Sequence, residues 1–177
     1  MPKSVNLVVT CTQRKKSEIP PELRLRSVKI SSLADRAQEW TDRLSGRFAT
    51  LVELSELYSS DHWFVARSIS EAGDATGLRV RLWVSSAGYG LLPFSCWVQP
   101  YSATFAAGQP DSVSHCPDGA ERQADNREWW HQLAQWQGPV PGEPRSLTGL
   151  AQRHPRTPLI VVGSPGYIDA MVLDLLA

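Results

Sequence analysis

The 177-residue sequence has no excess of charge of either sign, because 18 Lys and Arg residues balance 18 Asp and Glu residues. A neutral chain has no strong general attraction to nucleic acid, so such binding would require a local basic surface. The sequence also lacks any apolar run near the roughly 18 to 20 residues that a membrane span requires. The apolar stretch before "QRKK" is too short for a secretory signal. We therefore expect a cytoplasmic protein with no membrane partner.

Residue patterns that hold metals, nucleotides or disulfides are also missing. Cys11, Cys96 and Cys116 are widely spaced, odd in number and without a CxxC pair, which argues against a disulfide framework and a structural zinc site. The four histidines show no HxH, HxxxH or HExxH spacing. The turn "GSPGY" matches neither GxxxxGK[ST] nor GxGxxG. These absences predict no metal and no cofactor.

With 42% hydrophobic and 20% charged residues, the chain has the composition and size of one globular domain spanning residues 1–177. Short apolar runs predict buried strands at 5–12 and 159–162, and apolar residues that first alternate with basic ones predict a third strand at 78–86. Apolar residues at helical spacing predict helices at 31–44, 51–73 with a break near Ser60 or Asp61, 124–136, 146–154, and after the turn at 163–166. Strands separated by helices predict a three-layer α/β fold whose sheet is largely parallel and flanked by helices.

Three polar turns follow the predicted strands: "TCTQRKK", "SSAGYGLL" and "GSPGY". Because parallel strands end at the same edge of a sheet, we expect these turns to converge there, where ligands of such folds bind.

The turn "TCTQRKK" places hydroxyls, a thiol and three cations in succession. Thr12, Arg14, Lys15 and Lys16 are therefore candidate phosphate contacts. The alternative is that the first strand simply ends in a polar loop. Cys11 is a candidate nucleophile if nearby cations favour its thiolate. Its alternative is a buried, inert thiol.

Ser85 to Phe105 form a long stretch with no Asp, Glu, Lys or Arg but with two glycines, two tyrosines and four serines. Hydroxyls and backbone amides without charge suit a neutral, hydrogen-bonding ligand better than a bare phosphate. Alternatively, the glycines permit a tight turn and the tyrosines cover the end of the sheet.

This stretch resembles a segment of the YaaA superfamily, in which a strand ends in a small-residue pair, continues as Tyr-Gly-Leu-Leu and reaches a Pro-Tyr. The matching residues are Ser85, Ser86, Gly88, Tyr89, Gly90, Leu91, Leu92, Pro100 and Tyr101. The "CTQRKK" turn and "ELYSS" at residues 56–60 lie where the superfamily has a small-polar-Lys loop and a Leu-Tyr helix end. The resemblance covers about residues 5–108 and the last strand.

The resemblance implies nucleic-acid biology, and among its members the DpdC proteins of 7-deazapurine DNA modification fit this short chain best. It implies an enzyme that hydrates 7-cyano-7-deazaguanine in DNA, or in RNA, to the 7-amido form, with other base-modification proteins as partners. A noncatalytic DNA-binding or oxidative-stress protein is the alternative, and a transferase acting on a free nucleoside is a third possibility.

Under this hypothesis a planar purine binds at Ser85, Ser86, Gly88, Tyr89, Tyr101 and Ser164. Nitrile hydration requires a nucleophile or an activated water and a proton donor, without a mandatory metal. Cys11, or Cys96 within the uncharged stretch, could attack the nitrile. Lys15 or Tyr89 could donate the proton.

Overall fold

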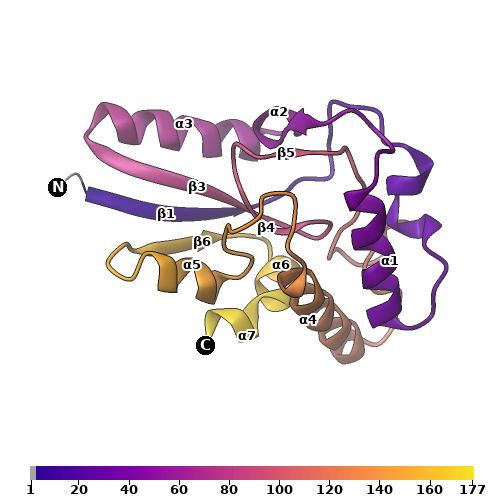
Figure 1. The fold of residues 1–177 in the computed structure, drawn as a ribbon. Helices are drawn as coiled ribbons and strands as arrows, with labels where there is room; N and C mark the ends of the chain where they lie inside the picture. The colour runs from indigo at the N-terminus through magenta and orange to yellow at the C-terminus, as the bar shows by residue number, and fades with distance from the viewer. Residues whose placement is uncertain (1–2) are drawn as a thin grey trace.

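A mixed four-stranded sheet lies at the centre of the computed structural model, which describes residues 3–177 (Figure 1). Its strand order is β4-β3-β1-β6, and a separate small sheet pairs β2 with β5. The strands are β1 (Lys3–Thr10), β2 (Val52–Glu53), β3 (Leu78–Ser86), β4 (Gly90–Pro93), β5 (Trp97–Val98) and β6 (Leu159–Val162). The helices are α1 (Leu33–Ser45), α2 (Leu54–Leu57), α3 (Asp61–Ala75), α4 (Gly119–Gln135), α5 (Leu147–Arg153), α6 (Pro165–Ala170) and α7 (Val172–Leu175), with short 3-10 helices at Pro21–Leu23 and Leu25–Ser27.

The three predicted strands form the parallel part of the sheet. β1 lies between β3 and β6 and runs parallel to both, with Thr10 beside Ser85 and Val9 beside Val162. Residues 5–10 of β1 are all buried, as expected of an apolar strand in the middle of a parallel sheet. The described residues thus form one α/β domain in which two of the three strand pairings of the main sheet are parallel.

The fourth strand was not predicted from the sequence. Instead of beginning a loop at Ser85, the chain makes a hairpin in which β4 returns antiparallel to β3, with Ser86 beside Gly90. Gly90 has a φ of +74°, a backbone conformation that glycine adopts without steric cost. The sheet is therefore mixed, with an antiparallel strand at one edge.

Most predicted helices are present, with different ends. Ser32 caps α1 through the backbone N–H of Asp35, and Ser146 caps α5 through that of Gly149. α4 begins five residues before the predicted start, because the Asp118 carboxylate accepts a hydrogen bond from the N–H of Glu121 and caps the helix there. None of the helices in residues 3–177 is long and apolar enough to cross a membrane.

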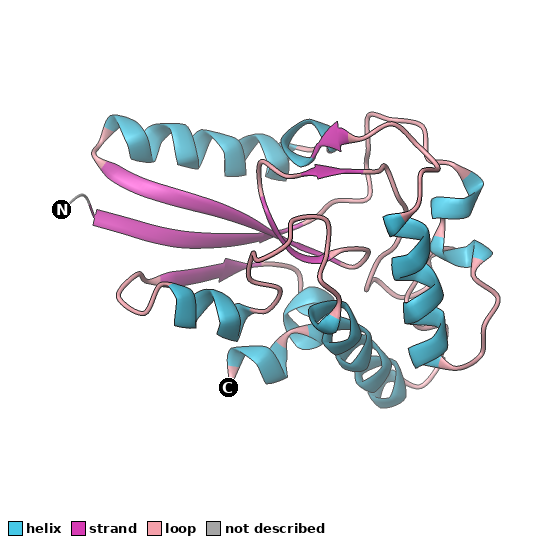
Figure 2. Cartoon of the chain, viewed as in Figure 1, coloured by secondary structure: helices cyan, strands magenta, loops and turns pink. Residues whose placement is uncertain are grey.

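The predicted helix at 51–73 is divided, as is the final helix. The break near Ser60 is confirmed, since α2 ends at Leu57 and the Ser60 hydroxyl accepts the N–H of Trp63 at the start of α3. α3 then continues past Gly73 to Ala75 and packs along β3 (Figure 2). The final helix is interrupted at Met171, which separates α6 from α7.

Two buried tryptophans fix the turn of the β3–β4 hairpin. Trp40 of α1 donates its indole N–H to the carbonyl of Gly88, and Trp129 of α4 donates to the carbonyl of Ala87, both at 2.8 Å. The Trp129 side chain is fully buried in the core. The core thus extends from the sheet to α1 and α4, and the two indole hydrogen bonds hold the hairpin turn in place.

Candidate functional site

The polar turns after β1, β3 and β6 do meet at one edge of the sheet. The backbone N–H of Cys11 donates to the carbonyl of Ser85 at 2.9 Å, which continues the β1–β3 pairing beyond the strand end. Gly163, just after β6, lies so close to Thr10 that a Cβ there would be 2.5 Å from Thr10 Cγ2. The predicted convergence of the three turns is confirmed.

Lys15 lies over two tyrosine rings at this edge. Its Nζ is 4.8 Å from the ring centre of Tyr101 and 5.4 Å from that of Tyr58, both within cation–π range. A β-bridge joins the backbones of Lys15 and Tyr58, and the ammonium donates to the carbonyl of Thr12 at 3.2 Å. The turn after β1 therefore folds back over the tyrosines and directs Lys15 inward.

Beneath Lys15, three hydroxyls form a buried chain. Ser86 Oγ is 2.5 Å from Tyr101 Oη, which is 2.6 Å from Tyr58 Oη. Ser86 Oγ also accepts the backbone N–H groups of Gly88 (3.1 Å) and Tyr89 (3.0 Å). This chain connects the hairpin turn to the residue that follows α2.

Cys11 lies near these hydroxyl groups and is buried, with 6% of its surface exposed. Its Sγ is 3.2 Å from Tyr167 Oη of α6, and the ring of Tyr167 packs edge-on against Phe105. The structure thus gathers six side chains, which we call the Cys11 cluster: Cys11, Lys15, Tyr58, Ser86, Tyr101 and Tyr167.

The electrostatics of the Cys11 cluster are governed by burial. Burial lowers the pKa of Lys15, while the Cys11 thiol and the Asp111 carboxylate act in the opposite direction. Burial raises the pKa values of Tyr58, Tyr101 and Tyr167 well above the ordinary value of a phenol, and the nearby Cys11 raises them further. The tyrosines therefore keep their protons at neutral pH, and Lys15 releases its proton more readily than an exposed lysine does.

Of three other predicted base contacts, Ser85 and Tyr89 direct their hydroxyls away from the Cys11 cluster, and Gly88 packs against one of its rings. Ser85 is buried on the opposite face of β3 from Ser86, and its hydroxyl donates to Met171 Sδ at 3.1 Å. Gly88 lies against the ring of Tyr101. Tyr89 is also buried, and its hydroxyl exchanges hydrogen bonds with the backbone N–H and carbonyl of Gln99.

Cys96 is buried just before β5, among groups distinct from the Cys11 cluster. Its backbone carbonyl accepts the N–H of Leu54 at 2.8 Å. Burial raises the pKa of its thiol to about 12, so that the thiol remains protonated at neutral pH.

Of the four predicted phosphate contacts, Thr12, Arg14 and Lys16 line the outer side of the turn after β1, whereas Lys15 is directed inward. Arg14 is exposed and Thr12 is half-buried, with its hydroxyl donating to the carbonyl of Arg14. Lys16 is exposed and forms an ion pair with Glu56 at 3.2 Å. Ser164, the remaining predicted base contact, is exposed after β6.

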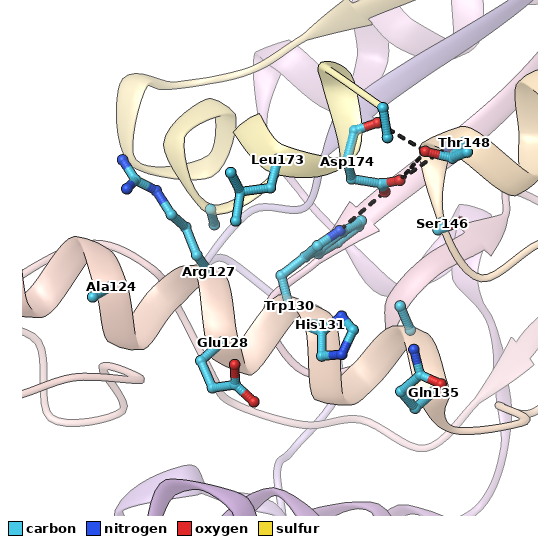
Figure 3. Close-up of a pocket in the computed structure, with 13 residues that line it drawn as sticks. Ala124, Arg127, Glu128, Trp130, His131, Gln135, Ser146, Thr148, Leu173 and Asp174 are labelled. Atoms are coloured by element: carbon cyan, nitrogen blue, oxygen red, sulfur yellow. Dashed lines mark hydrogen bonds between the residues drawn. The ribbon is translucent and has the colours of Figure 1, made fainter.

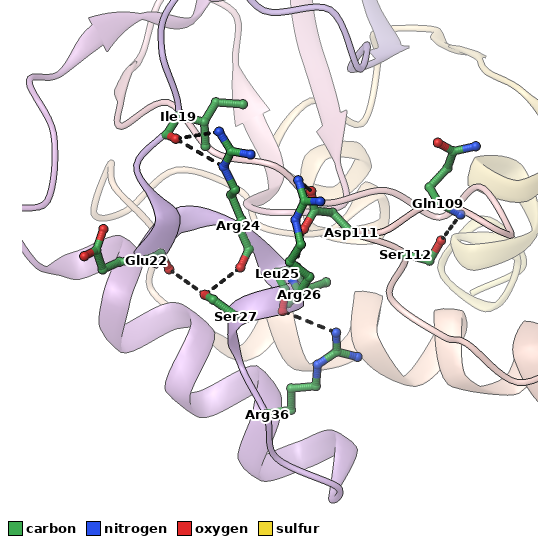
Figure 4. Close-up of polar contacts among 10 residues, drawn as sticks. All are labelled: Ile19, Glu22, Arg24, Leu25, Arg26, Ser27, Arg36, Gln109, Asp111 and Ser112. Carbon is green, nitrogen blue, oxygen red and sulfur yellow. Dashed lines mark hydrogen bonds and ion pairs between the residues drawn. The ribbon is translucent and has the colours of Figure 1, made fainter.

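The amino-terminal third of the chain, residues 1–47, is basic, with ten Lys and Arg residues against five Asp and Glu residues. Several of its arginines form hydrogen bonds and an ion pair within the protein (Figure 4). Arg24 donates to the carbonyl of Ile19, and Arg36 donates to the carbonyls of Leu25 and Val113. Arg26 pairs with the buried Asp111 carboxylate at 3.2 Å. These three arginines therefore stabilise the fold through hydrogen bonds and an ion pair within the protein.

A cavity of about 730 Å³ lies away from the Cys11 cluster, between α4, α6, α7 and the start of α5 (Figure 3). Arg127, Trp130 and His131 line its α4 side. The Asp174 carboxylate accepts hydrogen bonds from Trp130 Nε1 and from the backbone N–H and hydroxyl of Thr148. The polar groups that line this cavity thus join α7 to α4 and α5.

Tyr167 was not predicted as a member of the site, and Tyr58, a possible acid, base or anion contact within residues 56–67, was not assigned to it. Both occur in blocks that it singled out, "ELYSS" and "GSPGY", but neither block indicated that its tyrosine would turn toward Cys11. Within the described residues, no group of three or more His, Cys, Asp or Glu side chains could hold a metal ion. No protein-family model, curated protein or solved structure matches the chain.

Proposed function

We propose that this protein modifies a nucleic-acid base and that it hydrates the nitrile of 7-cyano-7-deazaguanine in DNA to the amide. The observation that carries the proposal is the position of a thiol, a desolvated ammonium and two tyrosine rings together at the carboxyl edge of parallel strands. Active sites of α/β folds are built at this edge. The proposal retains the three-layer arrangement, in which helices cover both faces of the sheet and leave this edge accessible. It also retains a cytoplasmic location, where a nucleophilic thiol stays reduced.

In the proposed reaction the sulfur of Cys11 attacks the nitrile carbon, and the C≡N bond becomes C=N. The nitrogen takes a proton from Lys15, whose pKa is lowered by burial, which makes it a better proton donor than an ordinary lysine. Water then adds to the same carbon and the C–S bond breaks. One proton of the water passes to the nitrogen, which completes the NH2 of the amide, and the other returns to Lys15. The sum is one nitrile and one water giving one amide, with Cys11 and Lys15 returned to their starting states.

The substrate approaches from the side of Lys15. Lys15 and Thr12 are half-buried, whereas Tyr58, Ser86 and Tyr101 are at most 1% exposed. A base that reaches Cys11 therefore displaces Lys15 from the tyrosine faces, which can stack on a purine. Exposed Arg14 and Lys16 are placed to contact the flanking phosphates, since an exposed ion pair such as Lys16–Glu56 costs little to break.

The test is the intact mass of a short DNA oligonucleotide that contains one 7-cyano-7-deazaguanine, measured after incubation with the protein. We expect the wild type to add the mass of one water. Cys11→Ala should abolish the addition and Lys15→Met should slow it about 100-fold, the usual effect of losing a general acid. Cys96→Ala should retain it, because the Cys96 thiol stays protonated.

Lys29→Met is the matched control for Lys15→Met, because Lys29 is exposed and belongs to the same basic third of the chain. An unchanged oligonucleotide mass with the wild-type protein would contradict the proposed function. If the protein then still bound the oligonucleotide with an affinity that fell steeply with salt, it would be a noncatalytic DNA-binding protein instead.

A further inference from the structure

On one face of the main sheet, α3 covers β3 but leaves β6 open. Gly73 of α3 lies so close to β3 that a Cβ there would be 2.5 Å from Val80 Cγ2, and the Ser70 hydroxyl donates to the carbonyl of Val80. β6 lies two strands away from β3, at the edge of the sheet. Strands are about 4.8 Å apart, so this distance is about 10 Å, which is the width of one helix.

Two side chains of β6 point to the face that α3 covers. Ile160 lies beside Leu7, and Leu7 lies beside Leu82, which shares its face of β3 with Val80. Val162, two residues after Ile160, points the same way. Ile160 is 50% exposed and Val162 is 46% exposed. Because apolar strands of a parallel sheet are normally covered on both faces, these two side chains form a surface that lacks its cover.

α3 itself has a second apolar side. Trp63 and Ala66 are buried against the rest of the protein, whereas Phe64, Val65 and Ile69 are exposed. A helix with one side in water normally carries polar residues there. Exposed apolar side chains that lie together are typical of a contact surface.

The exposed apolar side of α3 is turned toward β6. A helix between two neighbouring parallel strands makes a right-handed crossover, and α3 lies between β1 and β3 in this way. With its buried side on β3, this hand places Val65 and Ile69 on the flank toward β1 and β6, and Arg67 and Glu71 on the opposite flank. The apolar side chains of the two elements form what we call the α3–β6 face: Phe64, Val65, Ile69, Ile160 and Val162.

We propose that two copies of this protein pair through the α3–β6 face around a twofold axis. The two α3 helices then lie antiparallel in one layer, and each covers the β6 of the other copy. The space over β6 is one helix wide, and the chain presents a helix whose outer side is apolar. A twofold contact joins one patch to the same patch, so the chain needs no second surface for it.

The charges of the α3–β6 face also favour a second copy as its partner. None of the five side chains that define the face is charged, so two copies meet there without repulsion. An uncharged face also has no attraction for DNA. The pairing goes beyond the proposed function and does not depend on it.

The test is sedimentation velocity of the full chain over a wide range of protein concentration. We expect the wild type to form a particle of twice the mass of the 177-residue chain. Ile69→Lys and Val162→Lys change the two parts of the face, and each should raise the dissociation constant of the dimer about 100-fold, because an ammonium enters an apolar contact. Both positions are exposed in the single chain, so circular dichroism should show an unchanged fold.

Leu173→Lys is the matched control. Leu173 is exposed on α7, on the other face of the sheet, where Met171 accepts a hydrogen bond from Ser85. This variant should form the dimer as the wild type does. A high salt concentration should not weaken the dimer, since no charges meet at the face.

Four results would overturn the proposal. They are a wild type that stays monomeric at every concentration, a dimer that either Ile69→Lys or Val162→Lys leaves intact, an equal loss in Leu173→Lys, and a dimer that dissociates at high salt. The measurement uses no oligonucleotide. If the dimer behaves as expected and the oligonucleotide mass does not change, the proposed function fails and the pairing stands.

Discussion

At the scale of single residues, Gly88 is the position where the site tolerates least change. A Cβ at Gly88 would lie 2.3 Å from Cδ2 and Cε2 of the Tyr101 ring. Gly88→Ala should therefore displace this ring from Ser86 and Tyr58 and lower the free energy of unfolding by about 1–3 kcal/mol, as overpacking of a core does. The measurement is urea unfolding followed by circular dichroism.

Gly119→Ala is the matched control, because the nearest atom to a Cβ there is Arg122 Nη2 at 3.7 Å. Gly119 begins α4, where Ala has the better helix propensity, so no loss of stability is expected. Equal losses in the two variants would show that the contact with Tyr101 is not the cause.

Residue identities in the site could be predicted from the sequence better than their roles. Lys15, Cys11, Ser86 and Tyr101 were all selected from polar turns, and the structure places them together. Ser85 was selected with Ser86, although adjacent strand residues point to opposite faces. Tyr167 was missed, because its approach to Cys11 depends on how α6 packs after β6, which no local pattern encodes.

At the scale of elements, the β3–β4 hairpin is held by a residue far away in the sequence. The Arg145 guanidinium donates to the carbonyls of Tyr89, Leu91 and Trp136, and it lies over the Trp136 ring at 5.5 Å. Burial lowers its pKa to about 10. Arg145 therefore fixes the strand that follows the turn bearing Gly88.

Arg145→Ala should lower the free energy of unfolding by about 2–3 kcal/mol, because buried carbonyls lose charged donors. Arg145→Lys should lose nearly as much, since a single ammonium cannot match the planar guanidinium at three carbonyls. Thermal or urea unfolding measures both changes. Arg47→Ala, at an exposed arginine, should stay within about 0.5 kcal/mol of the wild type, and a similar loss there would contradict the assignment.

This hairpin also marks the limit of prediction at the level of elements. The strand at 159–162 could be predicted because it is a continuous apolar run, and the strand at 78–86 because apolar and basic residues alternate before the segment becomes apolar. The short run that becomes β4, "GLLP", follows Gly88 and Tyr89 and ends in proline, which is typical of a loop. Its antiparallel pairing with β3 and the bond from Arg145 hold it as a strand, while Trp40 and Trp129 hold the turn before it.

At the scale of the whole molecule, the fold buries weakly acidic hydroxyl and thiol groups and keeps them protonated. The sequence has four tyrosines, and all of them are buried: Tyr58, Tyr89, Tyr101 and Tyr167. Burial raises the pKa of each hydroxyl, and it raises that of the Cys96 thiol to about 12. In the unfolded chain the pKa values of these groups return to the ordinary values of tyrosine and cysteine.

The raised pKa values predict that the protein loses stability at alkaline pH. A group whose pKa is raised in the folded state stabilises that state below its unfolded pKa, and the contribution is lost as the pH rises toward the folded value. Above about pH 9 to 10 the unfolded chain releases protons that the folded protein retains, so each such group should lower the free energy of unfolding by roughly 1.4 kcal/mol per pH unit.

Urea unfolding at a series of pH values should show that the free energy of unfolding falls more steeply as the pH rises. The slope should be shallower for Tyr89→Phe, because one titrating hydroxyl is gone. The phenolate absorbance should rise together with the loss of circular dichroism, since a buried tyrosine ionises only when the chain unfolds. A phenolate signal that appeared well before unfolding would contradict the burial of these hydroxyls and of the hydrogen-bonded chain formed by Ser86, Tyr101 and Tyr58.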